Sequence, residues 1–225
     1  MINANLLPFF RELAQNNSKA WFNERKAQYK TMHQEFADGL LQVAFRLAEF
    51  DTQIRERLED PTTVKVHRIY NDTRFSKQAD PLKTNISGVI SAGGYAPMYY
   101  LRIEPAGSIL AGGMFMPSTE LLAAIREELA ESYDELEEIL QSDSVSSAFP
   151  AGLDRSMALK TAPRGYAADH PAIEFLRLKS FTVSRSLSDQ EVTGPDVQDT
   201  VVGLFEAQYE LHRYLRKAIR RLPDA

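Results

Sequence analysis

Apolar residues in the first 60 positions recur with the period of an amphipathic helix. A short apolar cluster at residues 6–13 is followed by a longer stripe of Phe22, Tyr29, Met32, Phe36, Leu40, Val43 and Leu47. Spacings of three, four and seven residues bring side chains to one helical face. Ser18 can accept a hydrogen bond from the first turn of a helix. The pattern predicts a helical region over 5–60, with a long helix over about 19–50.

The period changes to two in the next part of the chain. Apolar and hydrophilic residues alternate at 64–67 and again at 98–104, and further strands are expected at 86–91 and 108–115. This period is typical of half-buried strands. The chain is therefore expected to be strand-rich over residues 62–116.

Helical periodicity returns after this region. The pattern predicts helices over 118–141, a mixed segment over 150–186 and one C-terminal helix over 195–222. The strands follow one another closely, and the regular alternation of a doubly wound sheet is missing. We expect a single α+β domain over residues 1–225. It should hold a mainly antiparallel sheet of about 4–6 strands, with helices from both chain ends packed on it.

Composition narrows the class of protein. The chain has 225 residues, no cysteine, 44% hydrophobic residues and a net charge of −5. These values are typical of an ordinary soluble domain, and they exclude disulfide scaffolds and zinc sites with cysteine ligands. The acidic balance makes nucleic acid an unexpected partner. No signal peptide or membrane-spanning run is recognised, so we expect a cytoplasmic protein without a membrane partner.

Two segments are nevertheless basic. Residues 62–85 carry five Lys or Arg against two Asp, although the common phosphate-binding and hydrolase motifs are absent. Guanidinium, ammonium, hydroxyl and amide groups are the donors that a phosphate or carboxylate requires. The predicted ligand-binding residues here are Arg68, Arg74, Ser76, Lys83 and Asn85, with Asp72 as an acid–base candidate.

The second basic segment spans residues 151–185, with six Lys or Arg against three acids. Lys160, Arg164 and Lys179 are predicted ligand-binding residues, and His170 is the other acid–base candidate. Asp169, His170 and Pro171 resemble a helix start with Asp169 as the cap. His170 and Glu174 have a spacing found in metal sites, but further ligands are lacking. We expect no metal and no cofactor.

Three functions remain open. The first is binding of a small phosphorylated or carboxylated ligand in a basic cleft shared by the two segments, with or without acid–base catalysis. The second is a non-catalytic protein-interaction module, in which Asp72 and Arg74 stabilise a loop and the acidic residues of 118–143 meet a basic partner. The third is nucleic-acid binding along a basic face. The sequence indicates neither a particular protein partner nor a homo-oligomer.

Several motifs occur together in a characteristic order. They are Asn17 with Trp21-Phe22 and Tyr29, the run from Arg68 to Lys77, Pro81 to Thr84, Tyr99-Tyr100-Leu101, Gly112-Gly113-Met114, Met116-Pro117, and Leu159 to Lys179. In this order the chain resembles a family of conserved hypothetical bacterial and fungal proteins that share a domain of unknown function. Leu82 departs from the resemblance, which implies an aromatic residue there. The resemblance implies one domain and supplies no activity.

Overall fold

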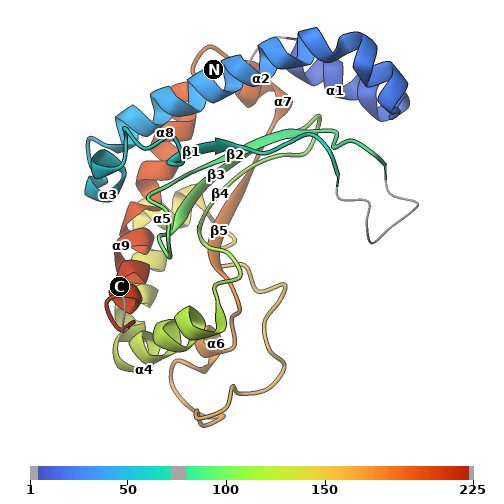
Figure 1. Cartoon of the computed structure of the whole chain (residues 1–225). Coiled ribbons are helices and arrows are strands. Elements are labelled where there is room, and N and C mark those ends of the chain that lie inside the picture. The colour runs from blue at the N-terminus through green and yellow to red at the C-terminus, as the bar shows by residue number, and fades with distance from the viewer. Residues whose placement is uncertain (1–4, 72–79, 223–225) are drawn as a thin grey trace. The chain divides into compact units, whose positions relative to one another are not determined.

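Five strands form one sheet in the order β1-β2-β3-β4-β5 (Figure 1). The computed structural model describes residues 5–71 and 80–222. The strands are β1 (Val64–Val66), β2 (Ile86–Ser91), β3 (Met98–Ile103), β4 (Ser108–Met114) and β5 (Phe181–Leu187). Strand β1 pairs with β2 in antiparallel register, with Val66 opposite Gly88. The predicted α+β class and the mainly antiparallel sheet are confirmed.

Helices precede, interrupt and follow the sheet. They are α1 (Leu6–Gln15), α2 (Lys19–Leu47), α3 (Thr52–Glu56), α4 (Thr119–Gln141), α5 (Asp143–Ala148), α6 (Ile173–Leu176), α7 (Asp189–Thr193), α8 (Val197–Ala207) and α9 (Tyr209–Ile219). Ser18 and Ser118 cap α2 and α4, each accepting a hydrogen bond from a backbone N–H three residues on. The Ser18 cap is therefore confirmed, and Ser118 caps α4 in the same way.

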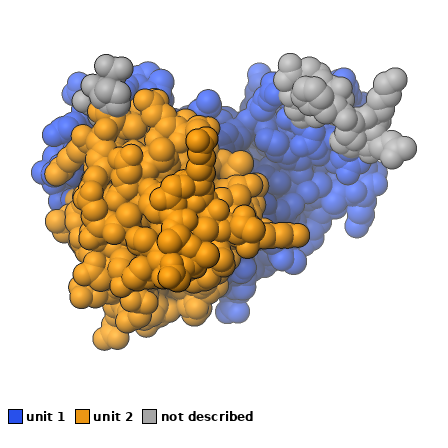
Figure 2. Space-filling model, turned by 90° about the horizontal axis from the view of Figure 1, so that it is seen from below, with its two compact units in different colours: residues 1–90, 100–110, 186–203 blue, residues 91–99, 111–185, 204–225 orange. Residues whose placement is uncertain are grey.

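The residues cluster into two compact units, coloured separately in Figure 2. Unit 1 comprises residues 1–90, 100–110 and 186–203. Unit 2 comprises residues 91–99, 111–185 and 204–225.

In unit 1, the apolar stripe of α2 packs on the sheet. Every residue of the predicted stripe, from Phe22 to Leu47, is buried. A Cβ added at Gly88 would lie 2.5 Å from Leu40 Cδ1 and 2.9 Å from the Lys65 carbonyl oxygen. Only glycine fits such a close approach, so Gly88 fixes how near α2 lies to β2.

In unit 2, the C-terminal segment is two helices and not one. The prediction of a single helix over 195–222 is wrong, because the helix breaks at Gln208. A Cβ added at Gly112 would lie 2.0 Å from Gln208 Nε2, so the Gln208 amide lies directly against β4. The break directs this amide at the sheet. Such a contact comes from a distant segment, and helical periodicity alone cannot predict it.

Helix α4 carries a second irregularity at Ser132, whose φ of −142° is not helical. The spacing from Ser132 to Glu135 suits a capping box. Glu135 instead pairs with Lys217 of α9, and the Ser132 hydroxyl donates to the carbonyl oxygen of Glu128. The two halves of α4 thus turn at Ser132 without that cap.

Candidate functional site

The predicted site residues fall in three places. Unit 1 holds Arg68, Lys83 and Asn85, while unit 2 holds Lys160, Arg164, His170 and Lys179. Asp72, Arg74 and Ser76 lie outside the described residues. That both basic segments face one cleft stays a prediction.

In unit 1, the chain on either side of residues 72–79 is paired. Tyr70 forms an antiparallel bridge with Leu82. The Asn71 backbone N–H donates to the Pro81 carbonyl oxygen over 3.1 Å, and the Asn71 side chain donates to the Asp80 carbonyl oxygen over 2.8 Å. The described residues on both sides of 72–79 thus form a hydrogen-bonded base.

The Asn17 side chain forms hydrogen bonds to this base. Its Nδ2 donates to the Leu82 carbonyl oxygen over 2.8 Å, and its Oδ1 accepts from the Leu82 N–H over 3.2 Å. Nearby, the ring of Phe22 lies edge-on to Tyr70, with centroids 5.9 Å apart. Burial, and then the charge of Tyr70, raises the pKa of Tyr29 to about 12. Residues that carry the family resemblance in separate stretches of sequence thus meet here.

Leu82 itself is 1% exposed. Where the resemblance implies an aromatic side chain, this chain has a fully packed leucine. The position therefore serves packing.

A bulge separates this base from strand β2. The His67 N–H donates to the Ser87 carbonyl oxygen over 2.8 Å, while Tyr70 lies opposite Leu82. Residues 83–86 thus oppose only residues 68 and 69. Bulges bend a strand and re-aim its side chains, and they are frequent beside functional sites. The bulge contains Lys83 and Asn85, both half-buried.

His67 is the centre of this region. Its Nδ1 lies 3.0 Å from the Ser87 hydroxyl, and its ring centroid lies 6.2 Å from that of Tyr100. Burial, and then the charges of Lys83 and Lys65, lowers the pKa of His67. The imidazole is therefore neutral at pH 7 and lies within electrostatic reach of two ammonium groups.

Neither ammonium is neutralised within residues 5–71 and 80–222, where Lys65 and Lys83 form no ion pair. Glu104 approaches the bulge through Thr84, whose hydroxyl donates to Oε1 over 3.0 Å. Its Oε2 lies 3.3 Å from Arg102 Nε, close enough for an ion pair but without hydrogen-bond geometry. Glu104 is thus already engaged. We name Lys65, His67, Lys83, Asn85 and Ser87 the His67 cluster.

The predicted residues of unit 2 form no comparable cluster. Lys160 and Arg164 are exposed, and no hydrogen bond or ion pair among the described residues joins them to Lys179 or His170. His170 Nδ1 accepts a hydrogen bond from the Ala172 N–H over 3.0 Å.

This bond corrects the predicted helix start. Helix α6 begins at Ile173 with Ala172 as N-cap, and Asp169 does not cap it. The ring nitrogen of His170 takes up a backbone donor just ahead of the helix. His170 thus has a local structural role that uses one of its two nitrogens.

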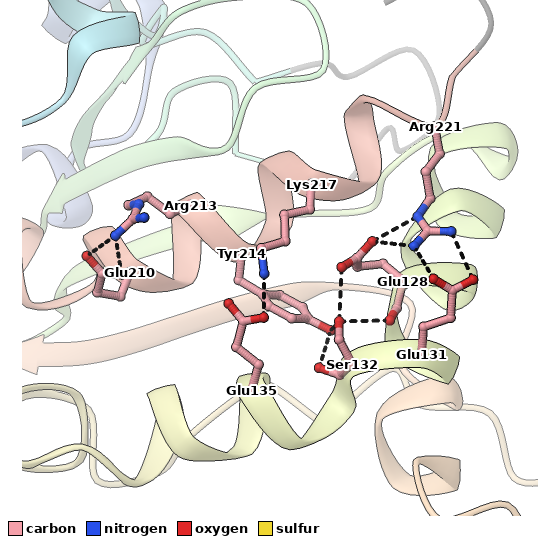
Figure 3. A network of polar contacts seen from close by, with 9 residues as sticks. All are labelled: Glu128, Glu131, Ser132, Glu135, Glu210, Arg213, Tyr214, Lys217 and Arg221. Atoms are coloured by element: carbon pink, nitrogen blue, oxygen red, sulfur yellow. Dashed lines mark hydrogen bonds and ion pairs between the residues drawn. The ribbon is translucent and has the colours of Figure 1, made fainter.

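Acidic residues of α4 pair with basic residues of α9 and of the chain just after it in unit 2 (Figure 3). Arg221 contacts Glu128 over 2.7 Å and Glu131 over 2.6 Å. The hydrogen bonds that Arg221 donates to Glu131 and Glu128 raise its pKa. Lys217 pairs with Glu135. Part of the acidic stretch that suggested a partner surface is therefore used inside unit 2.

A family model for conserved hypothetical proteins, DUF2461, matches residues 5–214. The chain belongs to this family. No curated protein and no solved structure matches the chain. Membership of DUF2461 confirms the resemblance and brings no activity with it.

Sequence reasoning missed Lys65, His67 and Ser87 as site residues. Lys65 and His67 occupy alternate positions in one strand, and Asn85 and Ser87 alternate in the next. Alternate residues share a face of a sheet, which is the signal that could have found them. The register that places His67 opposite Ser87 joins two different strands, and local charge does not give it.

None of the described helices is long and apolar enough to cross a bilayer. Within the same residues, no three His, Asp or Glu side chains gather closely enough to hold a metal ion.

Proposed function

We propose that this DUF2461 protein binds a small phosphorylated or carboxylated ligand at the His67 cluster of unit 1. The observation that carries the proposal is the pair of ammonium groups, Lys65 and Lys83, acting on one half-buried imidazole. Like charges held together without a carboxylate between them repel each other. An anion relieves that repulsion and gains a charge-assisted hydrogen bond from each donor.

The remaining polar groups suit the same ligand. Ser87 can donate to His67 Nδ1, which leaves the proton of the neutral ring on Nε2 as a further donor. Asn85 adds an amide from the bulge. Backbone pairing on both sides of the bulge fixes its ends before any ligand arrives.

His67 also replaces His170 as the acid–base candidate of the described residues. Its pKa lies below the usual value, so it is neutral at pH 7 and can accept a proton. An anion beside it stabilises the protonated form. Binding should therefore raise the pKa of His67 and take up protons near pH 6.

The test is calorimetric titration of the full chain with inorganic phosphate and with a small dicarboxylate, at low salt. We compare the wild type with Lys83→Met and with the matched control Lys217→Met, whose ammonium pairs with Glu135. Loss of one charged contact should weaken binding about tenfold in Lys83→Met, since 1.4 kcal/mol is a factor of ten. The control should bind like the wild type.

Equal binding by the two variants would rule out the His67 cluster, as would no binding by the wild type. Arg74→Ala then tests residues 72–79. A loss of phosphate binding in both Arg74→Ala and Lys83→Met would assign Arg74 to the same site. A loss in Arg74→Ala alone would place the anion site elsewhere.

A further inference from the structure

Two fully buried polar side chains of unit 2 lie at the break between α8 and α9. Gln208 and His212 are both 0% exposed. The Gln208 amide nitrogen and oxygen and both ring nitrogens of His212 make no hydrogen bond within the described residues. Buried polar atoms are nearly always hydrogen-bonded, and each exception requires an explanation.

Several other buried polar side chains do have hydrogen-bond or ion-pair partners. Asp51 accepts from two N–H groups at the start of α3, and Glu128 pairs with Arg221. The hydroxyls of Ser87, Ser108 and Ser180 are all hydrogen-bonded. Gln208 and His212 differ from these residues, because every polar side-chain atom of both is buried and unpaired among the described residues.

The surroundings restrict what could satisfy these atoms. The ring of His212 lies 4.3 Å from that of Tyr99, which also contacts Phe205 at 5.1 Å. The Gln208 amide lies against β4 at Gly112. Apolar rings and backbone disfavour an ion. Burial, and then the charge of Arg216, lowers the pKa of His212 well below its usual value, so the ring is neutral.

We propose that Gln208 and His212 bind an ordered water molecule inside unit 2. Residues four apart on a helix share a face, with Cβ atoms about 5–6 Å apart, so one small molecule can reach both side chains. A neutral imidazole offers one donor and one acceptor, and an amide offers both kinds. A water molecule gives two hydrogens and accepts two, which matches this set.

The proposal explains why a glutamine interrupts the C-terminal helix. Water held between Gln208 and His212 would tie the end of α8 to the first turn of α9. Gly112 leaves the amide the space to reach its position. The site is independent of the His67 cluster.

The test is nuclear magnetic resonance of the isotopically labelled wild-type protein. We expect cross-relaxation between a long-lived water and both the His212 ring protons and the Gln208 amide protons. The half-buried His33 of unit 1 is the matched control, because its ring is open to exchanging solvent and should show no such signal. A crystal structure should show a density peak within hydrogen-bonding distance of both side chains.

A direct hydrogen bond between Gln208 and His212 without a water signal would overturn the proposal. The absence of a water signal at both His212 and Gln208 would also overturn it. The single variants Gln208→Leu and His212→Phe should each lower the melting temperature. The double variant should lose less than the sum of the two, because it leaves no polar group unpaired.

Discussion

Lys83 of unit 1 and Lys217 of unit 2 show two uses of the same side chain. Lys217 ends on the carboxylate of Glu135 and joins α9 to α4 (Figure 3). Lys83 and Lys65 both act electrostatically on His67, and no described carboxylate neutralises Lys83. A charge that is already paired stabilises the fold. An unpaired charge held near like charges costs stability and is available to a ligand.

The largest loss of stability should come from disrupting an ion pair of unit 2. Glu128 is 8% exposed and pairs with Arg221. Glu128→Gln should lower the free energy of unfolding by about 2 kcal/mol, because it weakens a largely buried charge-assisted bond. The measurement is denaturation by urea. Glu127→Gln, at the exposed neighbouring position, should change stability by less than about 0.5 kcal/mol. Similar losses of stability in the two variants would contradict a stabilising role for the Glu128–Arg221 pair.

Acid should destabilise unit 2 through His212. Its folded pKa lies below the unfolded value, so the unfolded chain binds more protons as the pH falls below about 6.5. Stability is complete above that pH and decreases toward acid, by at most about 1.4 kcal/mol per pH unit for one proton. Urea denaturation between pH 7 and pH 5 measures this slope, to which His67 and His33 add in the same direction. His212→Phe should flatten the profile; an unchanged slope would remove His212 as its main source.

The two lysines should also differ, by a smaller amount, in their contribution to stability when no ligand is present. Lys217→Met removes a partly exposed ion pair and should cost up to about 1 kcal/mol. Lys83→Met removes only repulsion, so it should leave stability unchanged or slightly raised at low salt. Thermal melts of both variants at two salt concentrations make the comparison. A clear loss in Lys83→Met would indicate that Lys83 is a structural residue.

The smallest expected effect is a change in the pKa of His67. Lys83 contributes more than Lys65 to the lowered pKa of His67. Lys83→Met should therefore raise the pKa of His67, and Lys65→Met should raise it less. Histidine ring resonances followed from pH 8 to pH 5 report both values. The opposite order would place Lys65 closer to the imidazole.

Local pattern was enough for most of the fold. The α2 stripe and the Ser18 cap depend on neighbours in sequence, and both were predicted. The break at Gln208 depends on Gly112, almost 100 residues earlier, so no local sequence pattern predicts it.

The candidate site divides in the same way. Lys83 and Asn85 were identified from local charge, but His67 and Ser87 were not. Their pairing depends on the register between two strands, which local charge does not give. His170 was chosen for its chemistry, whereas its geometry gives it a backbone partner.

The side chain of Asn17 has a consequence for solubility. Leu82 points its own N–H and C=O away from Tyr70, since the bridge bonds are made by its neighbours. Such a free edge can recruit a strand from another molecule. One amide group covers both of these backbone groups, as a neighbouring strand would. The Asn17 side chain therefore prevents another molecule from pairing with this edge. Replacing Asn17 should increase aggregation during refolding.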